Sequence, residues 1–157
     1  MKAALAENGK MVWKDVPDPI VRKNDVLVKI YATALNRADL LQKNGAYPSP
    51  EGWPAWPGLE LAGTVEEMGQ TAREKSGLHI GDKVCALVGG GGYAEKAGIL
   101  SALVKNVWPL VKNVWPLVEN GAIRPSIYKV LPACQVNEAQ GILERFENTG
   151  KVVLKIR

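Results

Sequence analysis

The stretch DVLVKIYATALNRADLLQKNGAYP, residues 25–48, decides the fold. Apolar and polar side chains alternate through residues 25–35, which is typical of a strand with one buried face. Asn36 then stands where the N-cap of a helix belongs, and its side chain can accept a hydrogen bond from the amide near Asp39, whose charge suits the first turn. The stretch therefore predicts a half-buried strand followed by a short helix over residues 37–43.

Strand patterns also dominate the segments on either side. Five further strands are predicted, at residues 2–6, 11–16, 59–68, 84–88 and 151–156. The dipeptide Asn8-Gly9 suits the tight turn of a hairpin between the first two of them. Residues 45–58 carry four prolines, which remove backbone donors, so an irregular loop is expected there.

Two helices are predicted in the last third of the chain. Valines recur three and four residues apart between residues 101 and 121, which is a helical period. Residues 137–148 show a stronger pattern, with Asn137 as the N-cap and apolar side chains on one face. This order of elements predicts an α+β domain built on a partly closed β-barrel with a few peripheral helices.

The composition agrees with this class and excludes several functions. The 157 residues include 16 Gly and 10 Pro against a single Phe, which favours short elements joined by turns. The 20 Lys and Arg residues are scattered among 16 acids and do not cluster, so no nucleic-acid partner is expected. No apolar run approaches the roughly 18 residues that cross a bilayer, and no signal peptide is evident. We therefore expect a cytoplasmic protein without a membrane partner.

A glycine run at residues 89–92 is a candidate cofactor loop. Together with Ala94 it satisfies the pattern G-x-G-x-x-A directly after a predicted strand. A dinucleotide site also needs an acidic residue about 20 residues further on, and none stands between Glu95 and Glu119. Two interpretations stay open at this point: a minimal nucleotide loop, or a glycine-rich bend that links two strands.

Few side chains suit metal or nucleophilic chemistry. His79 is the one histidine, and Cys85 and Cys134 show no metal-binding spacing, so no metal site is expected. Cys85 stands inside an apolar strand, which should bury its thiol. Among the acids, Glu60 is a candidate to point inward because leucines flank it.

Three aromatic residues stand in the proline-rich loop: Tyr47, Trp53 and Trp56. They suit either an aromatic lip for a flat ligand or packing over the end of the barrel. The sequence pattern leaves both open.

Five segments together resemble one family. They are ALNRADLLQKNGAYP (34–48), PGLELAGTVEEMG (57–69), GDKVCALVGGGGYAE (81–95), ENGAIRPSIYKVLP (119–132) and GKVVLKI (150–156). In this order they are similar to zinc-free quinone oxidoreductases of the medium-chain dehydrogenase/reductase superfamily. The resemblance implies a single GroES-like domain over residues 1–157, made of an N-terminal part (1–98) and a C-terminal return (99–157). The NADPH-binding Rossmann domain that the family has between these parts is absent here.

The resemblance also implies a site and a reaction. Zinc-dependent relatives carry metal ligands where this chain has Asn36 and Leu59, which agrees with the expected absence of a metal. In the zinc-free family the residues that match Asn36 and Tyr47 lie beside the nicotinamide and the substrate. These two are therefore the candidate catalytic and cofactor-binding residues.

The implied chemistry is hydride transfer from NADPH to a quinone or enone. Without a cofactor domain, we expect this chain to be the substrate-side domain of such an oxidoreductase, to bind no NADPH and to be inactive alone. The alternative is a non-enzymatic binding or assembly module that reuses the barrel.

A seven-residue segment, VKNVWPL, occurs in tandem at 104–110 and 111–117. Because proline fits only the first turn of a helix, we expect Pro116 to begin a helix that leads to Gly121 and the first copy to form an extra arm. The apolar side chains of the arm, with the surface left by the absent domain, predict self-association, most simply as a twofold dimer.

Overall fold

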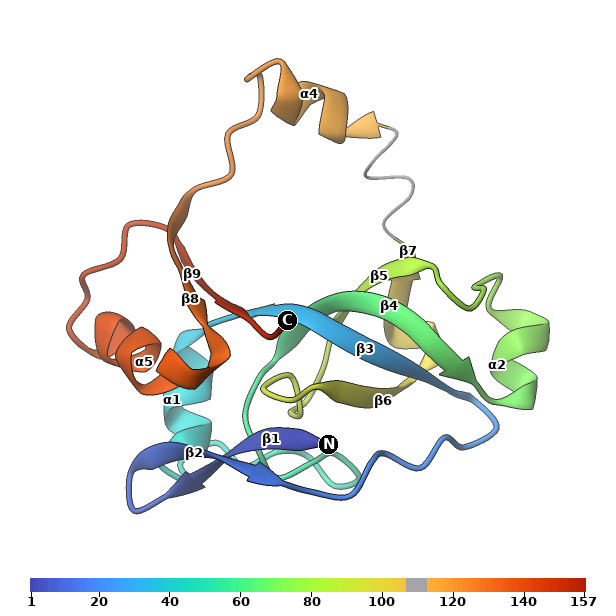
Figure 1. Ribbon diagram of the computed structural model, residues 1–157, viewed down its shortest axis with the longest axis horizontal. Helices are drawn as coiled ribbons and strands as arrows, with labels where there is room; N and C mark the ends of the chain where they lie inside the picture. The colour runs from blue at the N-terminus through green and yellow to red at the C-terminus, as the bar shows by residue number, and fades with distance from the viewer. Residues whose placement is uncertain (107–112) are drawn as a thin grey trace.

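The computed structural model describes residues 1–106 and 113–157 (Figure 1). Its strands are β1 (Lys2–Glu7), β2 (Lys10–Asp15), β3 (Asp25–Ala34), β4 (Glu60–Met68), β5 (Lys83–Leu87), β6 (Lys96–Leu100), β7 (Val104–Asn106), β8 (Ile127–Pro132) and β9 (Lys151–Lys155). Its α-helices are α1 (Arg37–Lys43), α2 (Gln70–Lys75), α4 (Trp115–Glu119) and α5 (Val136–Glu144), with 3₁₀ turns η1 (Ser101–Leu103) and η2 (Ala133–Gln135). This mixture of many strands and few helices agrees with the predicted α+β class.

Most strands belong to one sheet with the order β7-β5-β4-β3-β9-β8, and β6 pairs with β3 off this path. Its pairs are antiparallel, except that β8 and β9 run parallel. The hairpin β1–β2 forms a second sheet, which lies below β3 in the view of Figure 1. The end strands β7 and β8 do not pair with each other, so the described strands form an open sheet and the predicted barrel is not confirmed.

Strand β3 is the centre of the sheet because it pairs with three others. β4 lies along one edge, while β6 and β9 share the other edge. The register Ala32↔Lys155 and Ala34↔Val153 builds the end of the chain into the middle of the sheet. Beside this junction, the Leu35 N–H donates to the Val152 carbonyl at 2.9 Å. The start of β9 is thereby fixed next to the start of α1.

Two apolar clusters stabilise this arrangement. The first packs side chains of the large sheet, and the second joins the sheet to the β1–β2 hairpin and α5. The first includes Val26, Val28, Ile30, Leu61, Val65, Val84 and Ile99. The second includes Ala4, Met11, Leu35, Tyr93, Val136, Ile142, Val152 and Leu154. Their burial supplies most of the driving force for folding.

The turn, the strand and the helix predicted around residues 8–43 are confirmed as elements. Asn8 and Gly9 have φ of 49° and 73°, the left-handed conformation that a tight hairpin turn requires. β3 buries Val26, Val28 and Ile30, and α1 covers the predicted residues 37–43. β3 also buries Leu27 and Thr33, so the prediction of a single buried face is wrong: strands pair with both of its edges and the core covers more of it than of a surface strand.

The helix predicted over residues 101–121 is wrong. Residues 101–103 form η1, and residues 104–106 form β7, which pairs antiparallel with β5. This pairing satisfies backbone groups of β5 and buries Val104 against the first apolar cluster, which a helix could not do there. The first copy of the repeat therefore begins as an edge strand and not as an extra arm.

The second copy of the repeat ends in α4. This helix begins at Trp115 and has Pro116 in its first turn, as predicted. In Figure 1 α4 lies beyond the edge of the sheet. Residues 107–112, which hold part of the predicted valine stripe, lie outside the described residues.

Helix α5 differs from its prediction at both ends. It covers Val136–Glu144, and Asn137 is not its N-cap. The Asn137 side chain instead accepts the Met11 N–H at 2.8 Å and donates to the Met11 carbonyl at 2.8 Å. A long-range bridge to β2 therefore replaces the expected local cap.

The sequence pattern does not predict α2 or β8. α2 has only six residues and buries one of them, Ala72. β8 is an edge strand with five of its six residues exposed, so it lacks the alternation that marks a half-buried strand.

Within the described ranges, no helix has the length and apolar character needed to span a membrane. Both cysteines are free thiols, and Cys85 is half-buried, whereas its place in an apolar strand predicted full burial.

Candidate functional site

The first site residue lies at the junction of β3 and α1. Asn36 occupies the N-cap position with extended backbone angles, φ −122° and ψ 154°. Its backbone N–H donates to the Asp39 carboxylate at 2.7 Å, and the Asp39 N–H donates to the Asn36 carbonyl at 3.0 Å. The turn therefore fixes the Asn36 backbone while its carboxamide reaches two residues from other strands.

Asn36, Glu60 and Lys151 form a closed triangle of hydrogen bonds, which we call the Asn36–Glu60–Lys151 cluster. The Lys151 Nζ donates to Asn36 Oδ1 at 2.7 Å and to Glu60 Oε2 at 3.1 Å. The Asn36 Nδ2 also donates to Glu60 Oε2, at 3.1 Å. The three residues come from the start of α1, the first position of β4 and the first position of β9.

The cluster is open to solvent on one side. The side chains of Lys151 and Glu60 are 47% and 28% exposed, so their ion pair adds little stability, about 1 kcal/mol at most. An ammonium carries three N–H donors and a carboxamide two. The described residues engage two donors of Lys151 and one of Asn36. One N–H of each group is thus left for another acceptor.

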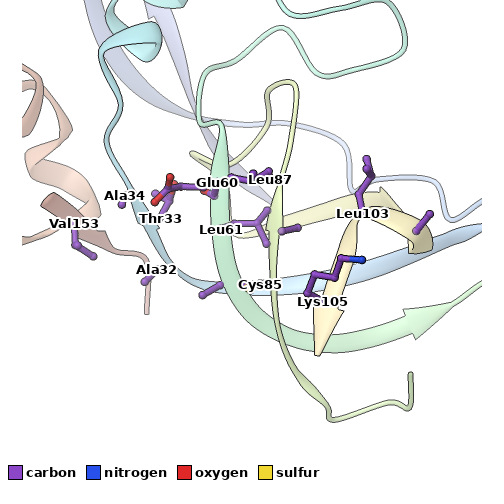
Figure 2. A pocket seen from close by; sticks show the side chains of 13 residues that line it. Ala32, Thr33, Ala34, Glu60, Leu61, Cys85, Leu87, Leu103, Lys105 and Val153 are labelled. Atoms are coloured by element: carbon purple, nitrogen blue, oxygen red, sulfur yellow. The ribbon is translucent and has the colours of Figure 1, made fainter. Parts of the chain in front are cut away.

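A pocket of about 710 Å³ adjoins this cluster (Figure 2). Its walls are mainly aliphatic and come from β3, β4, β5 and η1, with one residue each from β7 and β9. The lining residues are Ala32, Thr33, Ala34, Glu60, Leu61, Ala62, Cys85, Ala86, Leu87, Ala102, Leu103, Lys105 and Val153. Glu60 belongs to both the pocket and the cluster, and in Figure 2 it lies beside Thr33, with Lys105 on the other side of the view. The pocket can therefore take an apolar molecule, and Glu60 is the member of the cluster that lines it.

The second predicted site residue, Tyr47, lies in the loop after α1. Its backbone N–H donates to the Leu41 carbonyl at 3.2 Å, and it is 47% exposed. The hydrogen-bond partners of the Asn36 side chain are Glu60 and Lys151, and Tyr47 is not among them. The other aromatic residues of this loop, Trp53 and Trp56, line a separate pocket of about 630 Å³ near the N-terminus.

Sequence reasoning identified Asn36, and it identified Glu60 as an inward candidate, but it missed Lys151. The leucines on either side of Glu60 indicated that its side chain could point inward. Lys151 gave no signal of its own, because it is an ordinary charged residue at the start of a strand. Only the pairing of β9 with β3 brings it to Asn36.

A buried acid lies directly behind the cluster. Asp39 is 0% exposed and accepts the Tyr93 hydroxyl at 2.9 Å. Burial raises the pKa of Asp39 above its ordinary value of 3.8 and Glu60 adds to this, while hydrogen bonds from Asn36 and Tyr93 oppose it. Burial also raises the pKa of the Tyr93 hydroxyl well above 10.0, so it stays a neutral donor.

The glycine run is a bend between β5 and β6. The N–H groups of residues 91, 92 and 93 donate to the carbonyls of Trp56, Gly58 and Pro57 at 2.8, 2.9 and 3.0 Å. A Cβ on Gly58 would lie 2.4 Å from the Tyr93 backbone nitrogen, so the two segments can pack only with glycine there. These amides are engaged within the fold and do not face outward as a phosphate-binding loop would require.

In the part of the chain that the structure describes, no three His, Cys, Asp or Glu side chains are grouped closely enough to hold a metal ion. The Asn36–Glu60–Lys151 cluster contributes one carboxylate, an amide and a cation, which is not a metal-ligand set.

The sequence that builds this sheet and site matches a known protein family. Residues 22–108 match the alcohol dehydrogenase GroES-like domain, and the chain belongs to this family. An acryloyl-coenzyme A reductase of Sulfurisphaera tokodaii is 38% identical over 90 residues, which are 56% of this chain and 26% of that protein. A quinone oxidoreductase of Mus musculus is 34% identical over 84 residues, which are 53% and 24% of the two chains. The matched part thus spans about a quarter of these relatives.

Solved structures show the same fold. A probable oxidoreductase from Mycobacterium abscessus has a TM-score of 0.59 at 27% identity, covering 90% of this chain and 52% of that one. A mycobacterial protein complexed with NADPH has a TM-score of 0.58 at 22% identity, covering 84% of this chain and 45% of that one. Both structures are about twice the matched length.

Proposed function

We propose that this chain is the substrate-side domain of an NADPH-dependent quinone or enone oxidoreductase. The observation that carries the proposal is that Asn36 and Lys151 each keep an unused N–H donor while both are bound to Glu60, which lines an apolar pocket. A quinone or enone has the matching features, an apolar skeleton and a carbonyl oxygen that accepts hydrogen bonds. The relatives named as quinone oxidoreductase and acryloyl-coenzyme A reductase support this substrate class.

The cluster would act on the carbonyl oxygen. As that oxygen gains electron density during reduction, the Lys151 ammonium and the Asn36 amide would stabilise the developing negative charge. Glu60 would hold the ammonium in place through its 3.1 Å contact. Tyr47, exposed in the loop after α1, remains a proposed second wall for the substrate and the nicotinamide.

The glycine run is a poor match to a loop that binds the pyrophosphate of NADPH, because part of it is engaged within the fold. In this run, which was the candidate for that role, Gly91 and Gly92 donate their amides to the carbonyls of Trp56 and Gly58. We therefore propose that this chain binds no NADPH by itself and turns over no quinone alone, and that another domain supplies the cofactor. A cytoplasmic location and the absence of a zinc ion belong to the same proposal.

Binding of tetramethyl-1,4-benzoquinone tests the substrate site. All ring positions of this quinone are substituted, so it does not add readily to the free thiols of Cys85 and Cys134. Lys151→Met should weaken its binding about tenfold, the effect of losing one hydrogen bond from a charged donor. Lys129→Met is the matched control, because Lys129 is also 47% exposed and pairs with a glutamate. Equal affinity of Lys151→Met and the unsubstituted chain would reject the proposed site.

NADPH fluorescence and NADPH oxidation test the cofactor part separately. We expect no saturable change in NADPH fluorescence and no quinone-dependent oxidation with the chain alone. Turnover that disappears in Asn36→Ala would show that this part of the proposal is wrong.

A second candidate function is self-association through the face that carries the pocket. Leu87 is 74% exposed and Leu103 40% exposed at this face, which is a large apolar exposure for a lone domain. We propose a twofold dimer in which the pocket faces of two chains meet. Such a dimer would also support the alternative function, a non-enzymatic assembly module. Light scattering at tens of micromolar should report a dimer that Leu87→Lys converts to a monomer, with Ile20→Lys as the exposed control. A monomeric unsubstituted chain would refute the dimer.

A further inference from the structure

A buried pair of side chains connects the bend after β5 to the cluster. Tyr93 and Asp39 are both 0% exposed. The Tyr93 hydroxyl donates to Asp39 Oδ2 at 2.9 Å, and the same oxygen accepts the Asn36 backbone N–H at 2.7 Å. We propose that Tyr93 and Asp39 are positioning residues that aim the Asn36 carboxamide at Glu60 and Lys151. The functional importance of this inference rests on the proposed function, but the contacts it is drawn from involve no ligand.

The position of the Tyr93 hydroxyl is itself fixed by backbone contacts. The Tyr93 N–H donates to the Pro57 carbonyl at 3.0 Å, and its carbonyl accepts the Ala4 N–H at 2.8 Å. The ring packs in the second apolar cluster, against the hairpin and α5. The hydroxyl therefore reaches Asp39 from a rigid support, whereas Asn36 stands at a helix start, where chains commonly fray.

Asn36 is held by two different carboxylates. Asp39 binds its backbone, and Glu60 binds its side chain. The titratable groups that face Asp39 are Tyr93 and Glu60, and Lys151 contacts Glu60 in turn. Asp39 thus fixes the turn, while Glu60 together with Lys151 fixes the orientation of the carboxamide.

The loss of the Tyr93 hydroxyl would loosen this arrangement without changing any residue of the cluster. The Asp39 carboxylate would lose the donor that fixes its orientation in a site that water does not reach, so it could turn and hold the Asn36 N–H less firmly. The Asn36 carboxamide would then sample orientations away from Lys151. A purely structural tyrosine would instead lower the global stability and leave the folded state of Asn36 unchanged.

Nuclear magnetic resonance of the isotope-labelled chain distinguishes these cases. In Tyr93→Phe we expect the Asn36 Nδ2–H resonances to shift and the Asn36 backbone N–H to exchange with solvent about tenfold faster, after correction for global stability. Asp39→Asn should have the same effect. Tyr128→Phe, which removes the hydroxyl of an exposed tyrosine on β8, should leave both signals as they are.

The unsubstituted chain supplies a test that needs no variant. A scalar coupling through the hydrogen bond is expected between the Asn36 backbone nitrogen and the Asp39 carboxyl carbon. Absence of this coupling, or unchanged Asn36 signals in a folded Tyr93→Phe, would overturn the proposal. These measurements use neither quinone nor NADPH, so their outcome does not depend on the proposed function. If the Asn36 signals change in Tyr93→Phe but the separate quinone titration shows no binding, only the proposed function is rejected.

Discussion

Asn36 lies between two carboxylates that differ in their contact with solvent. Asp39 is fully buried, whereas the Glu60 side chain is 28% exposed and lines the pocket. The buried carboxylate therefore acts on the conformation of the turn, and the exposed one can meet a ligand. This division assigns structural consequences to Asp39 and binding consequences to Glu60 and Lys151.

Asp39→Asn should change how stability depends on pH. Burial raises the pKa of Asp39 in the folded chain, so the fold favours the protonated acid relative to the unfolded chain. The resulting stabilisation is complete below pH 3.8 and is lost as the pH rises through the raised pKa, by about 1.4 kcal/mol for each unit of the shift. Urea unfolding between pH 3.5 and 7, roughly the span of the effect, should show the unsubstituted chain losing stability relative to Asp39→Asn. If the free energy of unfolding of the unsubstituted chain stays constant or rises relative to that of Asp39→Asn as the pH rises, the prediction is wrong.

Gly92→Ala and Gly141→Ala should have opposite effects. A Cβ on Gly92 would lie 2.8 Å from the Glu60 carbonyl oxygen, so the backbone must shift, at a cost of about 1–3 kcal/mol. A Cβ on Gly141 in α5 would meet only the flexible end of Arg145, and alanine favours a helix by about 0.5–1 kcal/mol. Urea unfolding of both variants measures the two changes. Unchanged stability of Gly92→Ala would show that the close approach at Gly92 is not limiting, and a destabilised Gly141→Ala would contradict the prediction for α5.

At the level of elements, local signals predict local structure. β3 and α1 could be predicted because alternation and an acidic first turn lie within the segment itself. β7 could not, because its Val-Lys-Asn sequence fits a helical valine spacing and only the neighbouring β5 decides for a strand. Asn137 shows the same limit, since its partner Met11 belongs to a distant hairpin.

The tandem repeat gives a prediction for one whole element. Deletion of residues 104–110 or of residues 111–117 yields the same shorter sequence, which keeps Val-Lys-Asn for β7 and Trp-Pro-Leu-Val-Glu for α4. The deletion shortens the connection from β7 to β8, residues 107–126, by seven residues. The entropic effect of this change is small, so the free energy of unfolding should change by less than about 1 kcal/mol. The mass by light scattering should also stay unchanged, since the dimer is assigned to the Leu87 face. A larger loss of stability, or a change of mass, would assign a structural role to the second copy.

For the whole molecule, the site depends on contact between the N-terminal part of the chain and its last strand, β9. Asn36 and Glu60 come from the N-terminal part, and Lys151 comes from the last strand, held there by the bond from Leu35 to Val152. The sequence predicts the family and the N-terminal half of the site. It could not predict the third member, because no spacing rule connects residues so far apart. The open sheet face with its pocket likewise follows only from the assembled strands.

The most direct test of the account is a chemical-shift map of the labelled chain titrated with tetramethyl-1,4-benzoquinone. We expect saturable shifts at Asn36, Glu60 and Lys151 and along the pocket at Leu61 and Leu87, with no response of comparable size at Trp53 and Trp56 in the second pocket. The pattern should weaken in Lys151→Met and persist in Lys129→Met. Saturable shifts confined to Trp53 and Trp56, or no saturable shifts at any quinone concentration that stays dissolved, would contradict the assignment of the Asn36–Glu60–Lys151 cluster as the substrate site.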